Sequence, residues 1–161
     1  DKDSEGLLLL TNQGELVNKM MRSGNQHEKE YVVTVNKPVT KEFIKKMQDG
    51  VPILGTKTRK CRVIQTGEKS FRIILTQGLN RQIRRMCQYL GYEVKRLKRI
   101  RVMNIELGDL PVGSYREVTA QEMKTLQEMI KDSSETTVIK KERGKKCEPD
   151  RKNEGTRRIV K

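Results

Sequence analysis

Four consecutive leucines, at positions 7 to 10, follow an acidic stretch at the start of the chain. Apolar residues without polar alternation predict a strand that is covered on both faces. The preceding loop carries Asp1, Asp3 and Glu5, and carboxylates cannot be buried beside such a strand without a cation. Loop residues held at the end of a rigid core often carry function. We therefore expect a basic segment from elsewhere in the chain to meet this loop.

Apolar positions at helical spacing predict several helices. Asn12 can N-cap the first, with Glu15 at the reciprocal capping-box position. Thr40 and Gly50 bound the second, and Thr119 caps the last. Their apolar stripes are Leu16, Val17, Met20 and Met21; Phe43, Ile44 and Met47; and Met123, Leu126, Met129 and Ile130. Each stripe predicts a helix that packs on a core.

A further helix, from about Leu79 to Leu90, is apolar on one side and cationic on the other. The apolar positions are Ile83, Met86, Cys87 and Leu90, and the opposite ones are Arg81, Arg84, Arg85 and Gln88. A charged helical face is usually solvated surface, but such a surface normally mixes signs, and here no acids are interleaved. The residues 80–86 are therefore our candidate for the cation that meets the acidic loop.

β-branched and aromatic residues predict strands between these helices. The strands span residues 28–35, 58–66, 71–76 and 94–107. Residues 67–69 suit a hairpin turn. A change of apolar phase between Val102 and Met103 predicts a bulge or bend in the last strand. Tyr31 is either a strand aromatic whose hydroxyl reaches water or a ring that stacks on a nucleobase.

The formal charge of +14 and the pI of about 9.9 indicate a polyanionic partner. Nucleic acid is the leading class, and an anionic membrane surface is the alternative. No apolar run approaches spanning length and no segment resembles a signal peptide, so we expect a soluble, cytoplasmic protein that does not bind membranes.

The cysteines and the histidine limit the chemistry. Cys61, Cys87 and Cys147 are widely spaced without a C-x-x-C pair, which signals neither a disulfide framework nor a zinc site. We expect Cys61 and Cys87 to be packed thiols. His27 is the only histidine, which excludes a histidine metal cluster and disfavours a Ser-His-Asp triad. We therefore expect no metal.

The apolar pattern ends near residue 133. Residues 133–161 hold ten Lys or Arg and five Asp or Glu, which places +5 of the +14 there and leaves +9 on residues 1–132. Such a composition predicts a disordered, basic RNA-binding extension, and a remnant without function is the alternative.

Four motifs in order resemble the bacterial ribosomal RNA pseudouridine synthases of the RsuA type, and most of all their RluF branch. The motifs are D-x-x-S-x-G-L-L-L-L-T-N at 1–12, K-x-Y-x-V-x-V at 29–35, Q-G-x-x-R-Q-I-R-R-M at 77–86 and G-x-x-V-x-x-L-x-R at 91–99. The resemblance implies an α+β domain with a central mixed, mainly antiparallel sheet flanked by helices. Residues 1–132 would be a fragment of the catalytic domain, since the chain opens on Asp and the family's N-terminal RNA-binding domain is absent.

The resemblance also implies roles for individual residues. Asp1 takes the place of the catalytic aspartate, Tyr31 that of the tyrosine that stacks on the target uracil, and Arg84 that of the arginine that pairs with the aspartate. Leu97 is similar to a leucine that lines the base pocket. The other basic residues of the motifs are expected to bind RNA: Lys29, Arg81, Arg85 and Arg99. Arg81 and Arg85 are expected to face RNA instead of the aspartate.

The implied reaction is the isomerisation of a uridine in ribosomal RNA, the 23S molecule being the expected substrate and transfer RNA an alternative. It breaks the C1′–N1 bond and joins C1′ to C5 of the same base, so it needs no cofactor. An arginine would keep the carboxylate ionised and aimed, and the uridine would be flipped out of the RNA. A monomer is expected. The alternative function is a non-catalytic module that binds ribosomal RNA or the ribosome, in which Asp1 and Arg84 need not meet.

Overall fold

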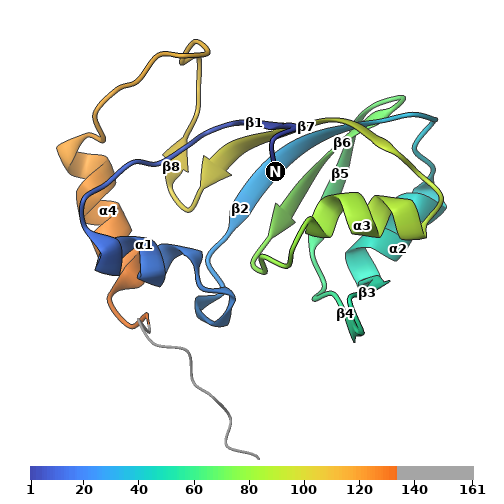
Figure 1. Ribbon diagram of the computed structural model, residues 1–161, viewed down its shortest axis with the longest axis horizontal. Coiled ribbons are helices and arrows are strands. Elements are labelled where there is room, and N and C mark those ends of the chain that lie inside the picture. Colours follow the sequence, from blue (N-terminus) through green and yellow to red (C-terminus); the bar gives the residue numbers. More distant parts are fainter. Residues whose placement is uncertain (134–161) are drawn as a thin grey trace, which may run out of the picture.

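The computed structural model describes residues 1–133, so the basic tail predicted after them lies outside the described residues. The strands of its main sheet are β1 Ser4–Gly6, β2 Lys29–Val35, β5 Arg62–Gly67, β6 Ser70–Leu75, β7 Val94–Val102 and β8 Ile105–Glu106. The strand order is β1-β7-β2-β6-β5, with β8 also paired to β7. β1 runs parallel to β7 and the other pairs are antiparallel. The predicted α+β fold with a mixed sheet is thereby confirmed (Figure 1).

The described helices cover the sheet in two groups. They are α1 Gly14–Met21, the 3-10 turn Ser23–Asn25, α2 Lys41–Asp49, α3 Gln82–Tyr89 and α4 Ala120–Ile130. Figure 1 shows α2 and α3 under one half of the sheet and α1 and α4 at its other end. Phe71 and Met86 are buried in the core of the first group, and Val102 and Leu126 in that of the second. Within residues 1–133, no helix has the length and apolar character needed to cross a membrane.

Two of the predicted helix caps are confirmed and one is wrong. Thr40 Oγ1 accepts from the Phe43 amide at 3.1 Å, and Thr119 forms a complete capping box with Glu122. Asn12 does not cap α1, whose N-cap is Gln13 and has no side-chain bond. The Gln13 amide instead donates to the hydroxyl of Thr11 at 3.1 Å, so the chain turns one residue later than the capping-box pattern indicates.

The leucine run is not a strand buried on both faces. The strand is Ser4–Gly6, and Leu7 is buried while Leu8 and Leu10 are 71% and 83% exposed. Gly6 explains the difference, because its φ of 111° takes the chain out of the sheet. A Cβ at Gly6 would lie 2.2 Å from Arg99 O. After this glycine, the leucine side chains point alternately into a small core and toward the surface.

The single strand predicted over residues 94–107 is two strands, and a hairpin turn lies where a bulge or bend was expected. Met103 and Asn104 connect β7 to β8, and Val102 is paired with Ile105. Met103 has a φ of 54°, which a tight hairpin turn requires. Sequence reasoning also missed the small hairpin of β3 Pro52–Ile53 and β4 Thr56–Lys57, and it began β5 four residues too early.

Candidate active site

The carboxylate of Asp1 and the guanidinium of Arg84 lie against each other, although 83 positions separate them in the chain. Arg84 Nε donates to Asp1 Oδ2 at 2.5 Å, and the Arg84 and Asp1 side chains are 14% and 16% exposed. A guanidinium restricts the orientation of the carboxylate that it binds. The predicted meeting of the acidic loop and the cationic helix is confirmed by this contact.

Backbone contacts fix the loop that carries Asp1. The Ser4 amide donates to Asp1 O at 3.1 Å, and the Asp3 amide donates to Asp1 Oδ1 at 3.2 Å. Arg84 Nη2 donates to Asp3 O at 3.1 Å. Beyond the loop, β1 pairs with β7, with Ser4 opposite Leu97. Helix α3 and the edge of the sheet therefore hold the loop from two sides.

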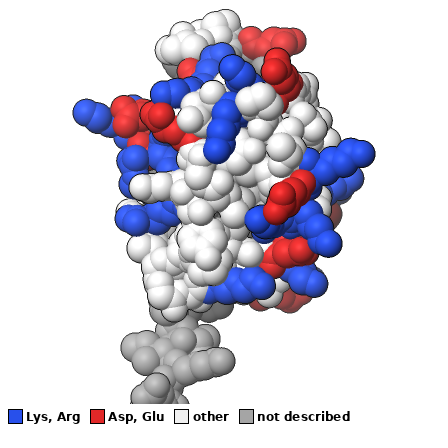
Figure 2. Space-filling model, turned by 90° about the vertical axis from the view of Figure 1, so that its right-hand side faces the viewer, with Lys and Arg blue, Asp and Glu red and all other residues white. Residues whose placement is uncertain are grey.

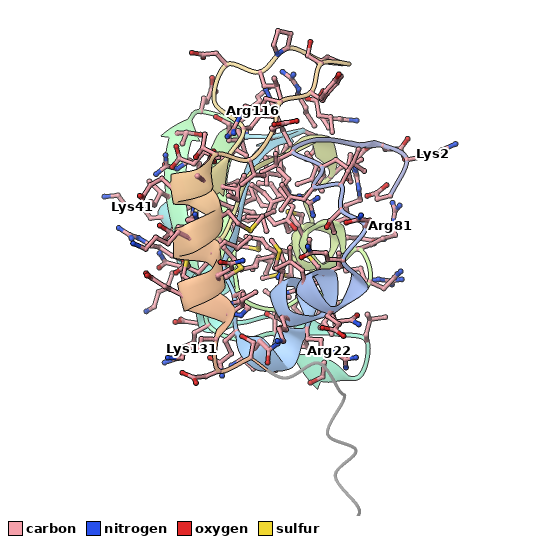
Figure 3. The ribbon with its side chains drawn as sticks, turned by 90° about the vertical axis from the view of Figure 1, so that its left-hand side faces the viewer. Lys2, Arg22, Lys41, Arg81, Arg116 and Lys131 are labelled. Atoms are coloured by element: carbon pink, nitrogen blue, oxygen red, sulfur yellow. The ribbon has the colours of Figure 1, made fainter. Side chains whose placement is uncertain are left out.

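Arg81 also binds Asp1, which the sequence analysis did not expect. Its Nη1 lies 3.1 Å from Asp1 Oδ1, and its side chain is 46% exposed. In Figure 3, Arg81 lies beside the N-terminal segment of the chain. Arg81 is the N-cap of α3 and has a left-handed backbone, so helical spacing did not predict this contact. Its role in binding RNA stays a prediction.

Tyr31 lies on the sheet face that α3 covers. It is paired with Arg99 of β7, and Arg99 is paired with Gly6 of β1. Directly paired residues on neighbouring strands share a face. Tyr31 is half-buried and packs against the core that contains Ile83 of α3. The ring therefore shares a side of the sheet with the helix that carries Arg84.

Leu97 and Arg99 lie on the same face as Tyr31. Leu97 is paired with Ser4 and Val33 and is 7% exposed, so it belongs to the core beside the N-terminal loop. Arg99 Nε donates to Leu7 O at 2.9 Å. These contacts fix both residues next to β1.

Lys29 is a buried cation at the start of β2. It is only 5% exposed, and its Nζ donates to His27 O at 3.3 Å. Burial, with a smaller contribution from Arg99, lowers the pKa of Lys29. A buried ammonium that donates to a neutral carbonyl favours an anionic partner. Lys29 and Arg99 thus add positive charge to the side of the sheet that holds Tyr31.

Arg85 differs from the other two arginines of this motif. It folds back on its own loop, where its Nε and Nη2 donate to the backbone and side-chain oxygens of Asn80 at 3.0 and 3.2 Å. The structure therefore does not bring Arg85 to Asp1, and its role in binding RNA stays a prediction.

Charges are mixed at the opposite end of the sheet. Figure 2 shows basic and acidic side chains interspersed around an uncharged centre on the side where α2 lies. Exposed ion pairs such as Lys46 with Glu42, at 2.8 Å, belong to α2. Around Asp1, in contrast, Arg81 and Arg84 share one carboxylate.

The described residues do not suggest a metal site or a reactive thiol. Within them, no group of three or more His, Cys, Asp or Glu could hold a metal ion. Cys87 is buried in the core and Cys61 is half-buried against it, so both are packed thiols, as predicted. Burial raises the pKa of Cys61 to about 11 and that of Cys87 to about 12. Two surface hollows of about 430 Å³ are lined by other residues and contain none of Asp1, Tyr31 and Arg84.

Comparison with known proteins settles the family. A family model described as RNA pseudouridylate synthase matches residues 1–89, which include Asp1, Tyr31 and Arg84. The chain belongs to this RNA pseudouridylate synthase family. The matched span joins the N-terminal loop to α3, the two segments that meet in the structure.

Individual relatives agree with this membership. The chain is 58% identical over 134 residues to "Dual-specificity RNA pseudouridine synthase RluF" of Escherichia coli K12, covering 83% of this chain and 46% of that protein. It is 36% identical over 133 residues to "Ribosomal large subunit pseudouridine synthase B" of Bacillus subtilis, covering 79% of this chain and 54% of that protein. The chain thus spans about half the length of the curated relatives that it matches. The resemblance to the RsuA type, with RluF among its most similar members, is confirmed.

A solved structure supports the fold assignment. The structure described as "Crystal structure of pseudouridylate synthase" superposes with a TM-score of 0.75 at 27% sequence identity, covering 78% of this chain and 56% of that one. The sheet and helices described above are therefore those of a pseudouridine synthase.

Proposed function

We propose that this chain carries the catalytic carboxylate of an RNA pseudouridine synthase and isomerises uridine to pseudouridine in RNA. The observation that carries the proposal is the contact between Asp1 and Arg84 at 2.5 Å. These two residues come from distant motifs and meet at α3, and Tyr31 packs against the core that contains Ile83 of the same helix. Membership of the family supports the same reaction.

The reaction converts a C1′–N1 bond into a C1′–C5 bond within one nucleotide. Asp1 is the group that initiates it, either by attack on C1′ or by removal of a sugar proton, and both routes need an ionised carboxylate. Arg84 supplies the counterion and the orientation. The detached base rejoins through C5, the hydrogen on C5 leaves as a proton, and N1 takes up a proton. Atoms and electrons balance without a cofactor.

The base must leave the RNA stack before it can reach Asp1. Tyr31 is half-buried on the sheet face that α3 covers, and its ring can replace the lost stacking partners of the uracil. Leu97 provides an apolar contact beside β1, and Lys29 and Arg99 supply positive charge for the anionic oxygens of the substrate. Each of these residues is assigned to substrate binding in this proposal.

The proposed substrate is ribosomal RNA of the large subunit, with transfer RNA as a second class. The name of the Bacillus subtilis relative refers to the large ribosomal subunit, and the name of the Escherichia coli relative describes a dual specificity. The higher identity to the latter supports testing both classes of RNA. The net charge of +14 suits either substrate because both are polyanions.

The test is release of tritium from RNA labelled at C5 of uridine. Because this chain spans half the length of its relatives, it is assayed alone and as a chimera in which it replaces the matched segment of the Escherichia coli protein. Large-subunit ribosomal RNA and transfer RNA are supplied separately. Tritium release that requires Asp1 supports the proposal. RNA binding by both proteins without any release would instead support a non-catalytic RNA-binding module.

A further inference from the structure

Two arginines occupy the one carboxylate of the candidate site. Arg81 donates to Oδ1 of Asp1 and Arg84 binds Oδ2. The Asp3 amide also donates to Oδ1, at 3.2 Å. An oxygen that attacks carbon or removes a proton needs a free lone pair directed at the substrate. Because an arginine binds each oxygen, the negative charge of the carboxylate is compensated and the two guanidinium groups partly cover it.

The two arginines are anchored to different degrees. Arg84 is 14% exposed and also donates to Asp3 O, so a second contact retains it. Arg81 is 46% exposed, and within residues 1–133 the contact with Asp1 is the one hydrogen bond that its side chain makes. Exposed ion pairs of this kind are weak. Arg81 is therefore the partner that an incoming anion can remove.

The backbone of Arg81 supports the same conclusion. Arg81 has φ 49° and ψ 37°, the left-handed region that residues other than glycine seldom adopt. It is also the N-cap of α3 and makes no side-chain cap bond there, and the start of a helix favours an anion nearby. Strained residues of this kind occur where a segment changes partners during function.

We propose that Arg81 is a displaceable partner of Asp1, which holds the carboxylate in the RNA-free protein and moves to an RNA phosphate when the substrate binds. The move frees Oδ1 for the reaction while Arg84 continues to orient Asp1 through Oδ2. Arg81 is thus a positioning residue that couples RNA binding to exposure of the carboxylate. The inference rests on the proposed function, because it assumes that RNA is the anion and that Asp1 acts on it.

A double-mutant cycle on RNA affinity tests this exchange without requiring turnover. The dissociation constant of a short single-stranded RNA with a central uridine is measured for the whole chain and for Asp1→Asn, Arg81→Gln and the double variant. Removing the carboxylate releases Arg81 to the phosphate, so Asp1→Asn should tighten binding by about two- to fivefold, the range of an exposed ion pair. In the Arg81→Gln background this gain should vanish.

Asp3→Asn is the matched control, since it removes the same charge from the same loop but its side chain makes no described contact with Arg81. Its effect should be equal in both Arg81 backgrounds. The slope of affinity against salt should fall by about one on Arg81→Gln whether residue 1 is Asp or Asn, because the proposal places Arg81 on a phosphate in both complexes. If Arg81→Gln does not fold, the cycle is repeated with Arg81→Asn, because asparagine tolerates the left-handed backbone.

Two other outcomes overturn the inference and can be told apart. If Asp1→Asn still raises RNA affinity in the Arg81→Gln background, Arg84 or the change in net charge explains the gain. That result would refute the exchange of partners by Arg81 but not the proposed function. Absence of measurable RNA binding by the unchanged chain also removes the inference, whereas the proposed function is decided separately by tritium release from the chain and the chimera.

Discussion

Replacing Arg84 with lysine keeps the positive charge beside Asp1 but removes the planar guanidinium. The guanidinium serves two acceptors at once, Asp1 Oδ2 at 2.5 Å and Asp3 O at 3.1 Å. An ammonium cannot reproduce this geometry because it is a point charge on a flexible stem. Arg84→Lys should therefore lose one charge-assisted hydrogen bond, which is about 1.5–3 kcal/mol.

The loss should appear in turnover more than in folding. If it is felt in the transition state, the rate falls by about 10- to 150-fold. The free energy of unfolding should change by only about 1 kcal/mol, because the retained charge still pairs with the partly exposed Asp1. Tritium release under single-turnover conditions in the chimera gives the first quantity, and urea unfolding of the same protein gives the second.

Arg85→Lys is the matched control for this experiment. Arg85 lies next to Arg84 in α3, but its guanidinium binds Asn80 and not Asp1. It should keep single-turnover chemistry on saturating RNA, while RNA affinity falls slightly. Turnover by Arg84→Lys equal to that of the unchanged protein would refute the orienting role of the guanidinium.

Three further predictions concern the cap of α2, the pH dependence of stability and the basic tail. Thr40→Ala should lower the free energy of unfolding by about 1 kcal/mol, because the Phe43 amide loses its acceptor; an unchanged urea midpoint would contradict this. The hydrogen bond from Arg116 lowers the pKa of Glu122 from 4.5 to about 2, so the stability that it contributes is present above pH 4.5 and is lost as the pH falls toward 2. Urea midpoints of Glu122→Gln should fall less steeply over that interval than those of the unchanged chain, and parallel curves would exclude the effect. Deleting residues 133–161 should weaken RNA binding at low salt and change it little at high salt; equal affinity at low salt would show that the tail does not contribute to binding.

Local signals in the sequence predicted most of the regular structure. Thr40 and Thr119 cap helices as expected because an N-cap depends on residues within one turn. The prediction of a buried strand over the leucine run was wrong, because Gly6, whose backbone lies close to that of Arg99, decides where the edge strand ends. That approach depends on the pairing of β1 with β7, which no local pattern contains. The prediction of one strand over residues 94–107 was wrong for a related reason. A hairpin turn and a bulge produce the same change of apolar phase in the sequence.

The sequence predicted the residues of the candidate site but not all of the contacts between them. Acidic and basic segments were matched by charge, and the family resemblance chose Asp1, Tyr31 and Arg84. The pairing of Asp1 with Arg84 followed from these arguments and is present in the structure. The second contact, from Arg81, depends on a left-handed backbone at the start of α3, and helical periodicity begins only after that residue.

The central claim is that Asp1 performs the chemistry, and Asp1→Asn tests it most directly. Asparagine keeps the shape of the side chain but removes the charge and the nucleophilic or basic oxygen. The measurement is pseudouridine mapping by carbodiimide treatment and primer extension on RNA exposed to the chimera, alongside RNA binding by the same variant. Asp1→Asn should bind RNA and leave its uridine unmodified, whereas Asp3→Asn, which contributes its backbone carbonyl to Arg84, should still form pseudouridine. Pseudouridine at the same position with Asp1→Asn would contradict the assignment of the site.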